Sequence, residues 1–130
     1  MSDSEKFIPE KAYGFRRVVK ATSYSLAGIK DAFNGEAAFK QECILCVILV
    51  PLAIFMPVDG TLRLLMILSI LQVCAFELLN SAIEAMVDKV CIGYDPLAKR
   101  AKDMGSAAVF VGLIIMVLVW STGVYSAFFN

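Results

Sequence analysis

Three long apolar segments constrain the fold of this chain more than any other feature of its sequence. Met104 to Phe129 and Cys43 to Val58 contain no charged residue, and Leu62 to Leu79 carries only Arg63 and Glu77. A helix of about 20 apolar residues is long enough to cross the hydrocarbon core of a bilayer. Because 59% of all residues are hydrophobic and the mean hydropathy is +0.75, the sequence predicts an all-α membrane protein with three transmembrane helices.

Turn residues divide these segments and give the expected helix bounds. Pro57 to Gly60 is a compact turn signal, which predicts an antiparallel hairpin of the first two spans, and Pro51 is tolerated inside the first span. Residues 92–102 form a surface loop that leads into a polar helix start. We expect a single domain, residues 1–130, with helices at about 36–57, 62–90 and 100–128. Such a small chain must bury apolar surface against lipid and sister chains, so we expect an oligomer.

A fourth helix, at about 14–34, precedes the spans. Its apolar residues recur at helical spacing while basic residues occupy the other faces, which is typical of an amphipathic helix lying on a membrane surface. The alternative is a packing helix on the soluble side. The apolar residues are Phe15, Val18, Val19, Leu26, Ile29 and Phe33.

Basic residues are distributed unevenly along the chain. Seven of the twelve Lys and Arg residues precede the first span, one lies between the first two spans, four lie between the last two, and none follows. The seven basic residues before the first span are Lys6, Lys11, Arg16, Arg17, Lys20, Lys30 and Lys40. The positive-inside tendency places the amino terminus and the second connection in the cytoplasm, with the first turn and the carboxyl terminus outside. The first 14 residues are polar, so we expect no cleavable signal peptide.

A polar face follows the second apolar segment. Glu77, Asn80, Glu84 and Asp88 share one side of a continuous helix, with Ser81 beside them. Glu77 and Glu84 are separated by roughly 10 Å along the axis, too far to grip one ion together but close enough to serve one extended substrate. The spacing indicates one proton-handling and one metal-binding group. The alternative is that these glutamates only hold helices together.

Other catalytic devices are absent from the sequence. There is no histidine, no Walker-type phosphate loop and no G-x-G-x-x-G, and the C-x-x-C of Cys43 and Cys46 lies inside an apolar helix, where small packing residues are expected. Carboxylates must therefore carry any acid–base chemistry. Glu36 and the basic cluster at 100–103 approach the same membrane face, and acids with bases can assemble a metal–triphosphate site. For Lys102, simple membrane anchoring is the alternative.

Several motifs resemble the prokaryotic diacylglycerol kinase family of small integral membrane enzymes. They are G-F-R-R-V-V-K-A from Gly14, E-A-A-F-K-Q-E from Glu36, E-L-L-N-S-A-I-E-A-M-V-D from Glu77 and R-A-K-D-M-G-S-A-A from Arg100. The resemblance runs from about Gly14 to Trp120. It implies three transmembrane helices and an amphipathic surface helix, assembled as a homotrimer with active sites between subunits.

The resemblance also implies an activity and a set of site residues. The activity is transfer of the γ-phosphoryl group from ATP to diacylglycerol at the cytoplasmic face of a bacterial inner membrane, with Mg²⁺ as cofactor and without a nucleic-acid partner. Glu77 matches the catalytic base, and Glu36 and Glu84 match metal-coordinating residues that also serve the nucleotide. The other matching positions are Arg17, Tyr24, Tyr94, Lys102 and Asp103 for nucleotide, Arg17, Ser25, Glu77, Ser106 and Trp120 for lipid, and Asn80 and Asp88 in support.

The sequence departs from the family pattern at two positions and leaves two other functions open. Gly35 stands where the family usually has asparagine, and Asp95 stands where histidine is familiar. Relatives of the same architecture phosphorylate undecaprenol, and the catalytic motif does not separate the two substrates. A non-catalytic scaffold or proton-conducting subunit could use the same carboxylates.

Overall fold

The computed structural model describes residues 13–129, so Lys6 and Lys11 lie outside the described residues. These residues form four helices and no strand, and three of the helices are long and apolar enough to cross a membrane. The predicted all-α fold with three membrane-spanning helices is therefore confirmed. The helices are α1 (Phe15–Gly35), α2 (Ala37–Phe55), α3 (Gly60–Val90) and α4 (Pro96–Phe129).

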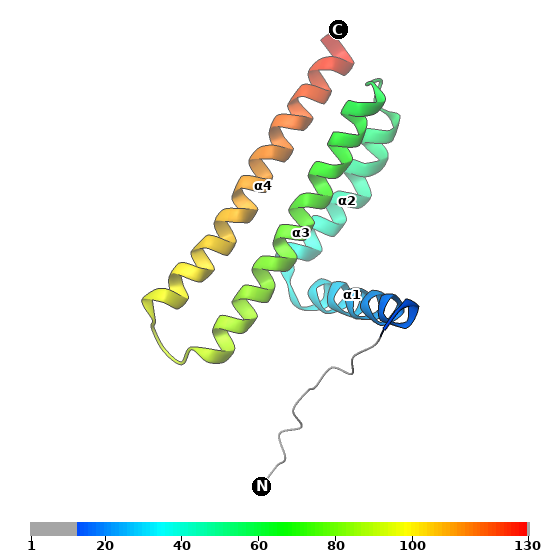
Figure 1. Ribbon diagram of the computed structural model, residues 1–130. Coiled ribbons are helices and arrows are strands. Elements are labelled where there is room, and N and C mark those ends of the chain that lie inside the picture. The colour runs from blue at the N-terminus through cyan, green and yellow to red at the C-terminus, as the bar shows by residue number, and fades with distance from the viewer. Residues whose placement is uncertain (1–12, 130) are drawn as a thin grey trace.

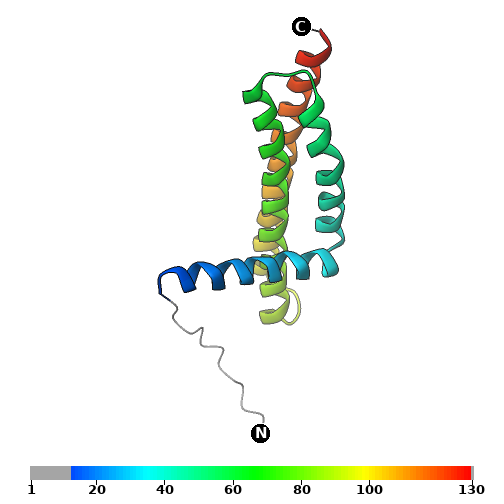
Figure 2. The same ribbon diagram turned by 90° about the vertical axis from the view of Figure 1, so that its right-hand side faces the viewer.

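Helix α3 is the centre of the molecule. Both α2 and α4 pack along it, and α1 contacts only α2 and α3. Figures 1 and 2 show the three long helices side by side, with α1 lying across them near the end that carries the α3–α4 loop. The α2–α3 turn and the carboxyl terminus lie at the opposite end (Figure 1). The chain thus has an α1 end and a turn end.

The α2–α3 turn is held by two polar side chains. The Asp59 carboxylate accepts hydrogen bonds from the backbone N–H groups of Thr61 and Leu62, at 2.8 and 3.1 Å, and so caps α3. The Arg63 guanidinium donates to the carbonyls of Ala53, Met56 and Val58, at 3.1–3.2 Å. The last carbonyls of a helix have no partner within it. Arg63 therefore satisfies the end of α2 and fixes the hairpin.

Glycines let α4 approach α3 closely. Gly105, Gly112 and Gly123 are buried, and a Cβ at any of them would overlap a side chain of α3. The side chains they face are Asn80, Phe76 and Met66, respectively. Gly112 lies between the other two, and Gly105 and Gly123 extend the contact towards both ends of α4.

Little of the apolar surface is buried within one chain. The core near the turn end consists of Ala53, Met56 and Met66, with Trp120 packed against it, while most large hydrophobic side chains of the spans are exposed. On α1, Phe15, Val18 and Leu26 are more than half exposed, and no α1 residue is buried. This surface suits contact with lipid or with other subunits.

Helix α4 begins at Pro96, earlier than the expected start at about residue 100. The Asp95 carboxylate accepts a hydrogen bond from the backbone N–H of Ala98 at 2.8 Å, which is the geometry of a helix cap. Proline is well suited to the first helical position, because its missing N–H would have no partner there. Asp95 and Pro96 together start the helix one turn before its basic cluster.

Candidate functional site

The polar face predicted on the second span is continuous, because α3 runs unbroken from Gly60 to Val90. Glu77, Asn80 and Glu84 are half-buried, whereas Asp88 is exposed near the end of the helix. The Asn80 amide Nδ2 donates to Glu84 Oε1 at 3.1 Å. This hydrogen bond fixes the orientation of the Glu84 carboxylate.

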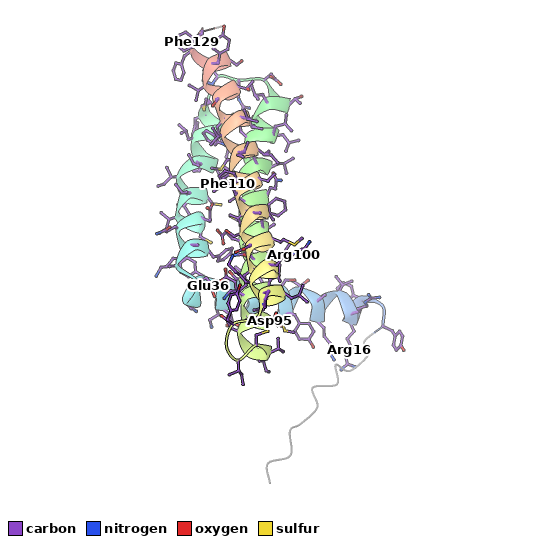
Figure 3. All side chains as sticks on the ribbon, turned by 90° about the vertical axis from the view of Figure 1, so that its left-hand side faces the viewer. Arg16, Glu36, Asp95, Arg100, Phe110 and Phe129 are labelled. Carbon is purple, nitrogen blue, oxygen red and sulfur yellow. The ribbon has the colours of Figure 1, made fainter. Side chains whose placement is uncertain are left out.

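Glu36 approaches this face from a different part of the chain. It is the single residue between α1 and α2, with an extended backbone, and its backbone N–H donates to the Ala32 carbonyl at 2.8 Å. The negative charges of Glu36 and Glu84 both act on Glu77. The hinge between two helices therefore brings a carboxylate beside α3, and Figure 3 shows Glu36 near the α1 end of the bundle.

A groove of about 550 Å³ lies between α1 and α3, and Glu36 is one of the residues that line it. Small side chains leave the space, since Gly28, Ala82 and Ala85 line it. Its polar lining includes Ser25, Asp31, Glu36 and Ser81. A polar wall on a mostly apolar groove suits a molecule with a polar head and an apolar body.

Helix α4 adds basic groups at the same end. Lys102 Nζ donates to Asp88 Oδ1 at 2.8 Å, linking α4 to α3, and the charge of Glu84 also acts on Lys102. Lys99 and Asp103 form an ion pair at 2.5 Å within α4, with both side chains more than half exposed. Lys102 therefore lies on the side of α4 that approaches α3, whereas Lys99 is paired within its own helix.

The carboxylates of the described residues do not by themselves form a complete metal-binding site. Within residues 13–129, no three acidic or cysteine side chains gather closely enough to hold an ion by themselves. Mg²⁺ is usually bound by one or two carboxylates together with substrate phosphates and water. Glu84, oriented by Asn80, and Glu36 supply hard oxygen donors of this kind. The donor set fits magnesium that arrives with a nucleotide.

Several predicted site residues are not brought together within one chain. Figure 3 shows Arg16, the neighbour of Arg17, at the outer end of α1, away from Glu36. Arg17 and Tyr24 are exposed on α1, which makes no contact with α4. Tyr94 is exposed in the loop before α4, and Ser106 is exposed on α4. These side chains remain open to a ligand or a second subunit.

Trp120 lies far from Glu77. Its indole Nε1 donates to the Met66 carbonyl at 3.3 Å, near the turn end. Met66 and Glu77 are separated by roughly 16 Å along α3, given a rise of 1.5 Å per residue. Trp120 thus ties α4 to α3 within the chain, and only a long ligand could reach from it to Glu77.

The structure reveals two residues to which the sequence assigned no role. Glu42 of α2 is buried, and its charge interacts with that of Glu77. Gly105 is buried against Asn80. The sequence does contain a signal for Glu42. It is the only acidic residue within 37–55, and at helical spacing it shares a face with Phe39 and Cys46. Cys74, isolated in the sequence, contacts Cys46 with a sulfur–sulfur distance of 3.3 Å.

Comparison with known proteins gives a consistent result. Residues 23–123 match the family described as prokaryotic diacylglycerol kinase. The diacylglycerol kinase of Pseudomonas aeruginosa is 51% identical over 109 residues, which cover 84% of this chain and 89% of the relative. The diacylglycerol kinase of Escherichia coli K12 is 44% identical over 115 residues, covering 88% and 94%. That of Helicobacter pylori J99 is 40% identical over the full length of both chains.

Proposed function

Because this chain belongs to the prokaryotic diacylglycerol kinase family, we propose that it transfers the γ-phosphoryl group of ATP to the primary hydroxyl of diacylglycerol. The products are phosphatidic acid and ADP. The observation that carries the proposal is the half-buried Glu77, on which the charges of Glu36 and Glu84 act, next to Leu78, which lines a mostly apolar groove with a polar wall. Relatives named diacylglycerol kinase, similar over most of the chain, support the substrate.

Glu77 is the proposed general base. An alcohol attacks phosphorus efficiently only when a nearby group takes its proton, and a carboxylate shielded from bulk water can do this. Glu77 is half-buried on the central helix, and its neighbour Leu78 lines the groove between α1 and α3. A lipid hydroxyl entering along the groove between α1 and α3 would approach it from the membrane interface.

The nucleotide would be held at the α1 end. Glu36 and Glu84 are the proposed magnesium ligands, and Lys102, at the start of α4, can approach phosphate oxygens. When bound, magnesium neutralises charge on the triphosphate. Asp88 holds Lys102 at 2.8 Å, which keeps the ammonium near the polar face of α3. Direct in-line transfer then needs no covalent phosphoenzyme.

The remaining proposed contacts lie around this centre. Arg17, Tyr24, Tyr94 and Asp103 are assigned to the nucleotide, and Arg17, Ser25, Ser106 and Trp120 to the lipid. Ser25 supports this assignment because it lines the groove together with Glu36. The exposed positions of Arg17 and Tyr24 favour a site completed between chains, so we include a homotrimer in the proposal.

The proposed location is the bacterial inner membrane. Basic residues gather near α1 and in the α3–α4 loop, which favours a cytoplasmic α1 end and an external turn end. That orientation would expose the nucleotide site to cytoplasmic ATP. It would also align α1 with the headgroups of the inner leaflet, where diacylglycerol presents its hydroxyl.

Phosphate transfer from labelled ATP to diacylglycerol in mixed micelles tests the function. We expect the purified native chain to form phosphatidic acid with Mg²⁺ and to lose activity when the metal is chelated. Glu77→Gln should remove turnover while retaining nucleotide binding, whereas Glu84→Gln should mainly weaken magnesium–ATP binding. Gln41→Leu, on the exposed side of α2, is the matched control.

Undecaprenol is included as a second acceptor in the same assay. Phosphorylation of undecaprenol alone would assign the chain a polyprenol substrate. Absence of transfer to either lipid by folded protein would leave the carboxylate face to a non-catalytic role.

A further inference from the structure

Glu42 is the one buried acidic residue in the described part of the chain. It lies in the first turns of α2 and is only 9% exposed. Its Oε2 is buried and accepts no hydrogen bond within the described part of the chain. A buried carboxylate oxygen without a partner is costly, whether the group is ionised or neutral. Its retention at this position calls for a reason.

The pairing of α2 with α3 places Glu42 beside Glu77. The sulfurs of Cys46 and Cys74 are 3.3 Å apart, and the two helices run antiparallel (Figure 1). One turn back from Cys46 is Glu42, and nearly one turn on from Cys74 is Glu77, so both carboxylates lie at the same level. The charge of Glu77 acts on Glu42. Glu42 therefore approaches Glu77 from α2, whereas Glu36 approaches it from the hinge.

Apart from Glu77, the titratable groups around Glu42 in the described part of the chain are thiols rather than carboxylates. The other titratable groups at this contact are the thiols of Cys43 and Cys46 on α2 and of Cys74 on α3. Lys40, on the same helix, lies over the Phe33 ring of α1, 5.4 Å from its centre. The charges of Glu36 and Glu84 also act on Glu77. Two adjacent carboxylates in such a place cannot both ionise easily and commonly share one proton.

We propose that Glu42 is a positioning residue that keeps the shared proton and donates a hydrogen bond to the Glu77 carboxylate. This inference rests on the proposed function, in which Glu77 is the base. The neutral Glu42 leaves Glu77 as the ionised member of the pair. It also fixes which Glu77 oxygen is free to accept a proton.

The proton balance of the reaction follows. The lipid hydroxyl loses its proton to the free oxygen of Glu77 as the new oxygen–phosphorus bond forms and the bond to ADP breaks. Glu42 retains its own proton throughout. Glu77 then releases the acquired proton to solvent, and the pair returns to its starting state with one proton between two carboxylates.

Two substitutions separate this role from simple packing. Glu42→Gln keeps the shape and an N–H donor but cannot lose a proton, and Glu42→Leu keeps the volume without a donor. We expect Glu42→Gln to retain kcat within about threefold and to lose the alkaline fall in the pH profile of kcat, because that fall reports removal of the shared proton. Glu42→Leu should lower kcat about ten- to a hundredfold, the effect of a lost hydrogen bond to a charged group, with KM for ATP unchanged. Gln41→Leu should match the native protein in both measurements.

Each outcome decides a different point. An inactive native chain overturns the proposed function, whereas an active native chain with native kcat in Glu42→Leu overturns only the inference about Glu42. A Glu42→Gln variant that folds but is inactive also overturns the inference about Glu42. The same holds if the alkaline fall in the pH profile of kcat is unchanged in that variant. If Glu42→Leu fails to fold, the pH profile of Glu42→Gln alone decides.

Discussion

Asn80 connects the packing of two helices to the geometry of the site. Its Nδ2 holds Glu84, while its Oδ1 is buried without a hydrogen-bond partner and lies against Gly105 of α4. An amide is needed here because a carboxylate would repel Glu84 and an apolar side chain could not donate. The absence of a side chain at Gly105 leaves the room that Asn80 occupies.

Gly105→Ala and Gly112→Ala test this connection as a matched pair. Both glycines are buried against α3, but an added Cβ would strike Asn80 at Gly105 and the Phe76 ring at Gly112. We expect each substitution to destabilise the fold by about 1–3 kcal/mol through overpacking. Only Gly105→Ala should also raise KM for magnesium–ATP, because it displaces the residue that orients Glu84.

Thermal unfolding in micelles and steady-state kinetics with varied ATP provide the two readouts. Equal KM values in the two variants, at similar unfolding temperatures, would show that Asn80 does not transmit the change to Glu84. In that case Gly105 serves helix packing alone.

At the scale of elements, aspartates begin two of the helices. Asp59 caps α3 at the turn end, and Asp95 caps α4 at the α1 end. The Asp95 cap fixes the first turn of α4, and Lys99 and Lys102 follow in the next turns. The observed contact of the Asp95 carboxylate is to the backbone of its own helix.

Asp95→Ala and Asp59→Ala compare the two ends of the molecule. Each should cost about 1 kcal/mol of stability, the usual effect of removing a helix cap. Asp95→Ala should also raise KM for ATP, because the first turn of α4 positions its lysines, whereas Asp59→Ala should not. Asp95→Asn retains the cap oxygen and should restore both properties. A rise in KM in Asp95→Asn equal to that in Asp95→Ala would instead indicate direct contact of the carboxylate with nucleotide.

Element-scale features were largely predictable from the sequence, while contacts between elements were not. Apolar runs and turn residues predicted the three spanning helices, and the 3.6-residue period predicted the shared face of Glu77 and Glu84. The burial of Glu42 depends on which side of α2 meets α3, and the role of Gly105 depends on the register of α4. Neither depends on local periodicity. The start of α4 at Pro96 differs from the expected start near residue 100 because Asp95 and Pro96, which are common in loops, here form the cap and the first turn of the helix.

At the scale of the whole molecule, one chain provides only part of the proposed site. Glu36, Glu77, Glu84 and Lys102 gather at the α1 end, but Arg17 lies on the exposed outer part of α1. The spans also leave broad apolar faces uncovered in the single chain. Both features are expected if α1 of one subunit reaches the carboxylates of a neighbour.

Mixing inactive variants tests for a shared site. We expect Arg17→Leu and Glu77→Gln each to be inactive alone and to recover activity when dissociated subunits are mixed and reassembled, because mixed trimers would contain sites that pair a native Arg17 with a native Glu77. Glu77→Gln mixed with Asn80→Leu is the control, since both changes lie on α3 and leave no chain with an intact face. Recovery in neither mixture, despite subunit exchange, would assign Arg17 and Glu77 to the same chain.

The length of α2 limits the bilayer thickness that the chain can match. Its 19 residues extend about 28 Å, close to the thickness of a bilayer's hydrocarbon core. One end is joined to α1 by a single residue, and the other is closed by the Arg63 clamp, so the chain has little freedom to adjust this span by fraying. A thicker or thinner bilayer would therefore shift the depth of Glu77 relative to the headgroups. Membrane thickness, and not only acyl-chain chemistry, would then select which lipid hydroxyls come within its reach.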